Sequence, residues 1–439
     1  MKPIIDEMGV RTEASDSDEI TIKHAVSFTH DIIVDGSMRV SSLRTLDGAM
    51  YGTGSLASYD VVSYAPAGTA RDGAVDWTAY IQATIDAATG NADPATISRI
   101  PKAAVYIPAG IYKITAPIVI RSVQGFHLFG DGPWLTRLSI ANNLDLDSLL
   151  ELDGVAWGVF ENFSLESSAA GRADKMLHLH WSAAAARSTT SNTFRNIVVS
   201  GRFRTAFAVG VVAGELGIQV DQSTFSDCIV IGQWDDGEIT DWQNAWEVGN
   251  DTHGNNVDHV LFAPGWTHVR YGIYVDASSV MAYGVHGGWA EVHFYVLGTG
   301  GPFVVDGMRM ESGRRLLYVS SGASVARVSL SNIDYTADYL NADGRWVYFS
   351  VGGSLRLTNI TLMYAPVGVT PNVYLNAPGT LTTCIAQGVS TPTAFSGSFV
   401  RSENVTLTVM NYQQLANNIP IAVTPMSIVG PGGLNWTPS

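Results

Sequence analysis

Residues 232–256 place tryptophans among carboxylates in a segment that interrupts an otherwise regular chain. The flat face of an exposed indole packs against a sugar ring, and neighbouring carboxylates bind hydroxyl groups or transfer protons. An inserted loop of this composition is a good wall for a binding groove. The alternative is that the tryptophans pack the loop onto the protein or lie in a subunit interface. The candidate substrate-binding residues of this segment are Trp234, Asp235, Asp236, Trp242 and Trp246.

Carboxylates that could cleave a glycosidic bond are Asp258, Glu291, Asp306 and Glu311, and these are the candidate catalytic residues. Hydrolysis uses two carboxyl groups that flank the bond, about 6.5–9.5 Å apart in inverting enzymes. Asp258 and Asp306 precede equivalent residues of the repeat described below. If they are two coils apart, their backbones are separated by roughly 9–10 Å. The alternative is that both are solvated surface acids.

Trp289 and Arg309 are close to these acids in the sequence and are the remaining substrate-binding candidates. Arg309 or His293, with a tyrosine or a lysine, would also suit a lyase, in which a base removes a proton beside a neutralising cation. His178 and His180 have the His-x-His spacing of some metal sites, but the sequence shows no third ligand. We therefore expect ordinary histidines, no metal and no cofactor.

From about residue 155 onward the chain repeats a short unit in which an Asn-like residue stands between apolar positions. The central residue has to allow a left-handed backbone bend, which Asn, Asp, His and Gly tolerate best. The flanking apolar residues would then point inward, and stacked coils would pair as parallel strands. The bend residues predicted in this way are Asn162, Asn196, Asp227, His259, Gly307, Asn332 and Asn359.

This repeat predicts an all-β fold, a single-stranded right-handed parallel β-helix. The alternative, a Greek-key sandwich, gives no reason for Asn at a fixed phase. The long interval between 259 and 307 is expected to contain two coils. An amphipathic α-helix over residues 76–89, with Asp76 as its N-cap, is expected to cover the N-terminal end. The predicted organisation is a leader over 1–56, the β-helix over 57–410 and a short tail over 411–439.

The composition excludes several classes of protein. Only 15% of the 439 residues are charged, and the net charge is −15. Such a chain is not expected to bind nucleic acid or an anionic membrane surface. We find no secretory signal, and no uncharged apolar run of the roughly 18 residues that a membrane span requires. The sequence therefore predicts a protein made in a cytoplasm and not inserted in a membrane.

The segment 59–132 resembles the start of pectate-lyase-like right-handed β-helix proteins. The resemblance lies in Asp60-Val61, Asp72-Gly73, Asp76-Trp77-Thr78, Ile81-Gln82 and the strand Val105 to Tyr112. Two departures are Ala65-Pro66 in place of a Gly-Ala loop and Trp77 in place of a second Asp. These residues are specific for the fold and not for an activity.

Within that family, the short leader and the polar solenoid look like bacteriophage tailspikes and capsule depolymerases. The resemblance implies a homotrimer in a virion that binds, and often hydrolyses, bacterial surface polysaccharide such as capsule, O-antigen or exopolysaccharide. The leader would bind other tail proteins of the virion. A trimerisation domain at the C-terminus, frequent in tailspikes, is not evident in the sequence. The alternatives are a non-catalytic structural or receptor-binding virion protein and a polysaccharide lyase.

Overall fold

The computed structural model divides into two units, Met1–Ser58 and Tyr59–Ser439. It describes residues 58–90, 104–167, 171–185, 187–210, 220–233, 243–249, 259–276, 279–297, 301–320, 326–336 and 344–364, together with separate short strands in the ranges 12–52 and 372–436. The strands of the first unit form antiparallel pairs, β1 (Thr12–Ala14) with β2 (Ile20–Ile22) and β3 (Ser42–Arg44) with β4 (Ala49–Gly52).

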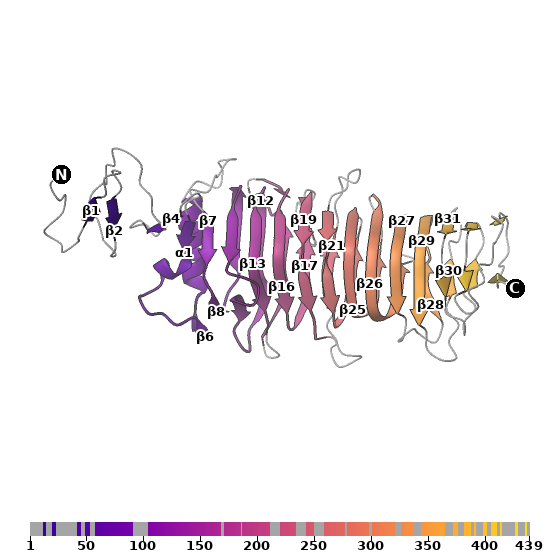
Figure 1. The fold of residues 1–439 in the computed structure, drawn as a ribbon, viewed down its shortest axis with the longest axis horizontal. Coiled ribbons are helices and arrows are strands. Elements are labelled where there is room, and N and C mark those ends of the chain that lie inside the picture. Colours follow the sequence, from indigo (N-terminus) through magenta and orange to yellow (C-terminus); the bar gives the residue numbers. More distant parts are fainter. Residues whose placement is uncertain are drawn as a thin grey trace. The chain divides into compact units, whose positions relative to one another are not determined.

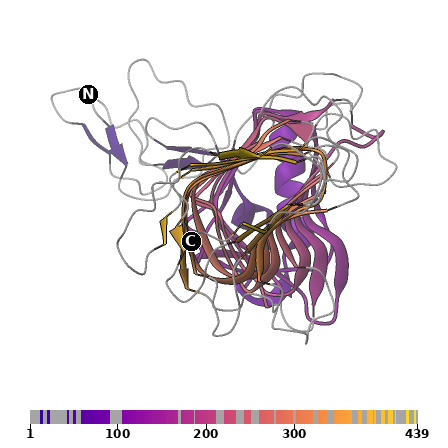
Figure 2. The ribbon, with the colours of Figure 1, turned by 90° about the vertical axis from the view of Figure 1, so that its right-hand side faces the viewer.

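The second unit is a right-handed parallel β-helix, so the predicted fold class is confirmed. Successive coils lie side by side (Figure 1), and a view along the stack shows the strands enclosing an interior (Figure 2). Three rows of parallel strands run through the stack and merge where strands are long. The first row is β9 (Ile118–Gln124), β12 (Asp145–Ala156), β14 (Arg172–His180), β17 (Phe203–Val209), β21 (Asn244–Val248), β24 (Val269–Val275), β25 (Val280–Val296), β26 (Phe303–Val319), β28 (Arg345–Phe349), β30 (Asn372–Leu375) and β33 (Ser398–Arg401).

The other two rows lie on either side of the predicted bend. The row before it contains β5 (Ser58–Asp60), β7 (Ala104–Ile107), β10 (His127–Gly130), β13 (Val159–Glu166), β16 (Thr193–Ser200), β19 (Ser223–Ser226), β22 (His259–Phe262), β27 (Ala326–Thr336), β29 (Gly353–Tyr364), β31 (Thr382–Gln387) and β34 (Val405–Met410). The row after it adds β6 (Asp72–Asp76), β8 (Gly110–Ile114), β11 (Thr136–Ile140), β20 (Ile229–Ile231), β23 (Gly265–Thr267), β32 (Ser390–Thr391) and β35 (Gln413–Gln414). Smaller pairings involve β15 (Thr189–Thr190), β18 (Val220–Asp221), β36 (Met426–Ile428) and β37 (Asn435–Trp436).

The left-handed bend recurs at equivalent positions of successive coils, as the repeat predicts. The backbone φ angle is 63° at Asn162, 50° at Asn196 and 53° at Asn359. These amides also bond to each other along the stack: Asn196 Nδ2 donates to Asn162 Oδ1 at 2.9 Å, and Asn359 Nδ2 donates to Asn332 Oδ1 at 3.1 Å. The asparagines therefore form a ladder along one edge of the β-helix.

The prediction that His259 is a bend residue is wrong. His259 lies inside β22, where it is buried and pairs with Ser223 and Val280. The bend falls four positions later in the chain, at Ala263 (φ 46°), and the following coil bends at Gly284 (φ 63°). Gly284 supplies the additional coil expected before Gly307. The sequence pattern failed because neither Ala nor this Gly stood in an Asn-like copy of the repeat.

The interior is filled by apolar side chains that stack from coil to coil. Phe160, Phe194 and Phe225 form one such stack, with ring centroids 5.1 and 4.6 Å apart. All three are almost completely buried. Each coil thus buries the apolar face of its neighbour, which is the main stabilising contribution in a solenoid.

A single helix, α1 (Thr78–Thr89), packs against β7, β9 and the 3₁₀ turn η1 (Val61–Tyr64) at the N-terminal end of this unit. Ile81, Ile85 and Ala88 form its buried face. The helix begins at Thr78, later than predicted, because Asp76 still belongs to β6. The Asp76 carboxylate nevertheless accepts hydrogen bonds from the Thr78 amide at 3.0 Å and its hydroxyl at 2.7 Å. None of the described helices is long and apolar enough to cross a membrane.

Candidate functional site

A row of tyrosines runs along the first strand row of the β-helix. The ring centroids of Tyr274 and Tyr295 are 5.1 Å apart, those of Tyr295 and Tyr318 are also 5.1 Å apart, and the rings lie within 6° and 21° of parallel. Tyr348 and Tyr374 continue the row at 4.8 and 5.1 Å. We call these residues the tyrosine ladder. Each is half-buried, so the rings cover one another's faces and present their outer edges to solvent.

The local sequence explains the ladder. Each tyrosine stands between two buried apolar residues of its strand, as in Ile273-Tyr274-Val275 and Leu317-Tyr318-Val319. Alternation in a strand therefore places the tyrosine on the outer face while its neighbours fill the core. Exact pairing of the strands then aligns one tyrosine with the next.

A cavity of about 240 Å³ opens beside the ladder and contains one carboxylate. It is lined by Tyr271, Glu291, Val292, Tyr295, Arg315 and Tyr318. Arg270 of β24 donates through Nε to Glu291 Oε2 at 2.8 Å, so an arginine of one coil fixes the carboxylate of the next. We call this cavity the Glu291 cavity.

Arginines accompany the tyrosines along the same strands. The Arg315 guanidinium lies 5.5 Å from the Tyr318 ring centroid, and the Arg345 guanidinium lies 4.0 Å from that of Tyr374. A cation over a ring face is attracted by the negative charge density of that face. These contacts hold the guanidinium groups along the ladder, in a chain whose net charge is −15.

Two tyrosines of the cavity, Tyr271 and Tyr318, remain protonated donors in the neutral pH range. Burial raises the pKa of Tyr271 to about 12 and also raises the pKa of Tyr318. A phenol that keeps its proton can donate to a hydroxyl or a carboxylate oxygen but is a weak base. The cavity therefore offers neutral and cationic donors next to one carboxylate acceptor, which suits recognition of a polyhydroxylated ligand.

Further carboxylates stand at the N-terminal end of the ladder. Glu247 of β21 pairs in register with Tyr274, is 7% exposed, and accepts hydrogen bonds from Thr205 Oγ1 at 2.5 Å and Asn244 Nδ2 at 2.9 Å. Burial, and next the negative charge of Glu247, raises the pKa of Asp276. Two interacting carboxyl groups in different surroundings are a common source of an acid and a base.

The structure separates the acids that the sequence grouped. Glu291 lies in the Glu291 cavity. Asp306 pairs with Tyr283 and Ser331, and its Oδ1 accepts from Ser331 Oγ at 2.8 Å and Asn332 Nδ2 at 2.7 Å. Its carboxylate thereby joins the Asn edge of the β-helix and is not brought next to Glu291.

Other predicted residues lie in β25 and β26, in the part of each strand that follows the bend. Arg309 and Glu311 are exposed there, and Arg309 pairs in register with His286 and Asp334. The Trp289 ring is half-buried and lies 6.4 Å from that of His268. These residues do not line the Glu291 cavity.

The prediction that Trp246 binds substrate is wrong. Its side chain is 0% exposed and stacks on Phe207 at 5.0 Å inside the β-helix, so it presents no ring face to a ligand. The position before the bend, assigned to Asp258, belongs to Phe262, which pairs with Ser226 and Tyr283. The remaining predicted residues, Trp234, Asp235, Asp236, Trp242 and Asp258, lie outside the described residues.

The predicted lyase role of His293 does not fit its position. The residue is 0% exposed, and its Nδ1 accepts from the Trp266 indole at 3.2 Å, while Nε2 lies 3.2 Å from the Ser312 carbonyl oxygen. An indole can only donate, so Nδ1 carries no proton and Nε2 does. Burial lowers the pKa of His293 to about 3. It is a neutral core residue.

The tyrosine ladder was missed from sequence, although the sequence holds a signal for it. Tyrosine recurs between apolar residues in IYV, FYV, LYV, VYF and VYL, at 273–275, 294–296, 317–319, 347–349 and 373–375. Together with the Asn repeat, this second repeat predicts a row of aligned tyrosines on one face of the β-helix. Glu247 and Asp276 carry no comparable pattern.

Comparison with known proteins agrees with the coil topology. Residues 62–280 match the family of rhamnogalacturonase A/epimerase, pectate lyase-like. Among curated proteins, none matches the sequence. 

Several solved structures resemble the chain at low identity. A tailspike of Acinetobacter phage vb_AbaP_AS12 is 10% identical with a TM-score of 0.48, over 85% of this chain and 64% of the tailspike. The A-module of the mannuronan C-5 epimerase AlgE6 from Azotobacter vinelandii is 14% identical with a TM-score of 0.38, over 83% of this chain and 97% of the module. The Agl-KA catalytic domain is 11% identical with a TM-score of 0.42, over 80% of this chain and 68% of that domain. From the family match and the stacked parallel coils, the chain is a pectate-lyase-like right-handed parallel β-helix protein.

Proposed function

We propose that this protein binds a bacterial surface polysaccharide along the tyrosine ladder, with the Glu291 cavity as the principal sugar subsite. The observation that carries the proposal is the combination, in one cavity of about 240 Å³, of Glu291, Arg315 and the tyrosines Tyr271, Tyr295 and Tyr318. Sugar hydroxyl groups need both donors and acceptors, and this lining supplies both. The repeat of the ladder from coil to coil suits a polymer that also repeats.

The pectate-lyase-like family supports a polysaccharide as the ligand class. The role in a virion is a further part of the proposal. It rests on the resemblance of the polar solenoid to tailspikes, with a homotrimer as the working form and the leader 1–56 as the segment that binds other tail proteins. Light scattering of the full chain, and co-purification of residues 1–56 with tail proteins of a candidate phage, test these two points.

Binding is tested with purified capsule, O-antigen and exopolysaccharide from candidate hosts by calorimetry. Tyr295→Ala and Tyr318→Ala should each lower the affinity for the polysaccharide that binds. Tyr283→Ala is the matched control, because Tyr283 also stacks on an aromatic neighbour, Phe262 at 5.6 Å, but lies outside the ladder. Equal affinity for the wild type and both ladder variants would overturn the proposal.

Hydrolysis of the bound polysaccharide is the second candidate function. It is favoured by the raised pKa of Asp276 beside Glu247, at the end of the ladder, since a raised pKa makes a carboxyl group a more suitable general acid for the leaving oxygen. In this scheme Glu247 is the partner carboxylate, and Glu291 binds the neighbouring sugar. New reducing ends that are lost in Asp276→Asn, while binding persists, would support hydrolysis. An unsaturated product would instead support a lyase, and binding without any product would leave a receptor-binding protein.

A further inference from the structure

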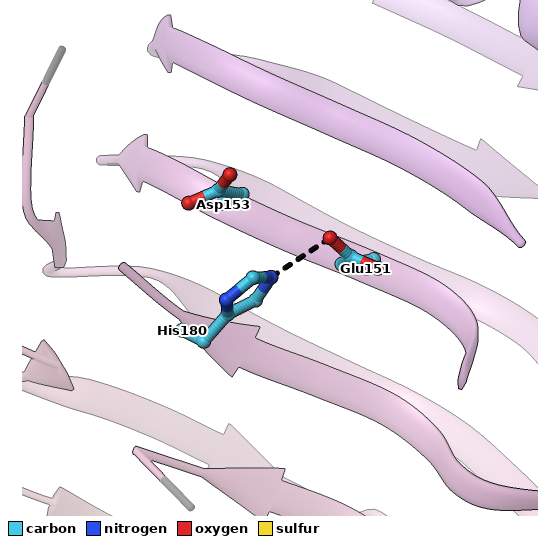
Figure 3. Close-up of side chains that lie close together, drawn as sticks. All are labelled: Glu151, Asp153 and His180. Atoms are coloured by element: carbon cyan, nitrogen blue, oxygen red, sulfur yellow. Dashed lines mark hydrogen bonds and ion pairs between the residues drawn. The ribbon is translucent and has the colours of Figure 1, made fainter. Parts of the chain in front are cut away.

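A compact group of metal-binding side chains lies on the first strand row, nearer the N-terminus than the tyrosine ladder. Glu151 and Asp153 come from β12, and His180 comes from β14, the equivalent strand of the next coil (Figure 3). One ligand atom of each residue lies within 4.8 Å of those of the other two. His180 Nε2 and Glu151 Oε1 are 2.9 Å apart. We call these three residues the coil-bridging cluster.

Neighbouring groups fix the orientation of both carboxylates. Ser182 donates to Asp153 through its amide at 2.8 Å and through its hydroxyl at 2.6 Å, and Ser148 Oγ donates to Glu151 Oε2 at 3.1 Å. Asp153 is 0% exposed, and the side chain of Glu151 is 18% exposed. Such outer partners orient ligands in metal sites and raise their affinity.

The charges leave room for a cation. Arg121 donates through Nε to Asp153 Oδ2 at 2.7 Å, and its Nη2 lies 3.8 Å from Glu151 Oε1, so one guanidinium offsets one of the two negative charges. With a neutral His180 the cluster keeps one net negative charge. Two ligand atoms that each lie about 2.0–2.1 Å from one metal ion are about 3 Å apart. The distance of 2.9 Å between His180 Nε2 and Glu151 Oε1 is therefore compatible with an ion bound to both.

His178 packs against the cluster. Its ring stacks on that of His180 with centroids 4.3 Å apart and planes within 4°. It is 5% exposed, and its Nε2 atom is buried without a hydrogen-bond partner among the described residues. A buried polar nitrogen without a partner is costly unless something satisfies it.

We propose that Glu151, Asp153 and His180 bind one divalent transition-metal ion, with Zn²⁺ as the fitting case, and that the ion clamps two successive coils of the β-helix. An imidazole with two carboxylates suits zinc and its neighbours better than calcium or magnesium, which take oxygen ligands alone. Because the ion would take the Nε2 lone pair, a neutral His180 would carry its proton on Nδ1 when the ion is bound. The competing account is a permanent ion-pair network of Arg121, Asp153, Glu151 and His180 without a metal.

The test uses the full chain, stripped with a chelator and titrated with ZnCl₂ at pH 7.5. Metal analysis after dialysis should give about one zinc ion per chain, and the melting temperature should rise with zinc. His180→Gln and Glu151→Gln should lose both effects. His127→Gln is the matched control, because His127 Nε2 lies at the same 2.9 Å from Glu161 Oε1 but the described residues supply no third ligand there.

A further variant tests the geometry without removing a ligand. Ser182→Ala should bind zinc about 10–100-fold more weakly, because Asp153 loses a partner that orients it. The proposal is overturned if zinc neither remains bound after dialysis nor raises the melting temperature. It is also overturned if His180→Gln and Glu151→Gln respond to zinc as the wild type and His127→Gln do. Loss of folding in one variant is recognised by circular dichroism, and the decision then rests on the other two.

Discussion

Arg270 and Glu291 form an ion pair of 2.8 Å across two successive coils, and Glu291 lines the cavity beside the tyrosine ladder. The pair fixes a carboxylate acceptor between aromatic and cationic donors. In the proposed function Glu291 binds the sugar, and in the hydrolysis scheme Asp276 transfers the proton.

We expect Glu291→Gln to weaken polysaccharide binding without abolishing it. A hydrogen bond to a charged acceptor contributes about 1.5–3 kcal/mol, so the dissociation constant should rise roughly 10- to 150-fold. Calorimetry with the wild type and the variant measures this change. Any cleavage rate at saturating polysaccharide should stay within a few-fold of the wild type, and a complete loss at saturation would instead place Glu291 among the catalytic residues.

Two substitutions at Tyr318 separate its hydroxyl from its ring. Tyr318→Phe removes one hydroxyl donor of the cavity, at a cost of about 0.5–1.5 kcal/mol in binding. Tyr318→Ala also interrupts the stack between Tyr295 and Tyr348, so it should lower affinity further. The measurement is affinity by calorimetry, with melting temperature as a check on folding. Unchanged affinity in the alanine variant would remove the ladder from the binding surface.

The Asn edge of the β-helix should be sensitive to β-branched residues. Asn196 has φ 50° and donates to Asn162 Oδ1, so Asn196→Val places a branched side chain in a left-handed bend and removes this hydrogen bond. We expect the free energy of unfolding to fall by about 1–3 kcal/mol, measured by urea denaturation. Asn196→Gly tolerates the bend, so its free energy of unfolding should fall by less. An equal fall in both variants would mean that strain in the left-handed bend is not the cause of the destabilisation.

Stability should fall between pH 6.5 and 4.5 because of buried histidines. Burial lowers the pKa of His259 to about 4, that of His293 to about 3 and that of His178 to about 2. In the unfolded chain these groups bind protons below about pH 6.5. The unfolded state then takes up more protons than the folded state, so stability is complete above pH 6.5 and decreases as the pH falls.

Urea denaturation at several pH values tests this expectation. The slope for each buried histidine approaches about 1.4 kcal/mol per pH unit below pH 6.5. His293→Gln should reduce the slope, because one buried histidine with a lowered pKa is removed. A stability that stays constant from pH 6.5 to 4.5 would contradict the burial of neutral histidines.

The fold was largely predictable because its main requirement is local. A left-handed bend needs Asn, Asp or Gly, and the phase of Asn162, Asn196, Asn332 and Asn359 revealed the coil. The prediction failed at His259 because the coil there bends at Ala263, a residue with no intrinsic preference for that conformation.

The site was less predictable because it depends on register between distant segments. Glu291 was found from its type, but its cavity forms only when Tyr271, Val292 and Arg315 align on successive coils. Trp246 was misassigned because tryptophan is equally suited to a core, where its ring stacks on Phe207 of the preceding coil. Likewise, the carboxylates that lie beside His180, Glu151 and Asp153, come from the preceding coil.

The binding of a host polysaccharide by the double variant Tyr295→Ala/Tyr318→Ala is the most direct measurement. The wild type and Tyr283→Ala should bind the same capsule, O-antigen or exopolysaccharide with equal affinity, and the double variant, although folded, should lose at least tenfold, or about 1.4 kcal/mol. If the folded double variant binds as tightly as the wild type, the sugar does not lie along the ladder and the proposed function fails.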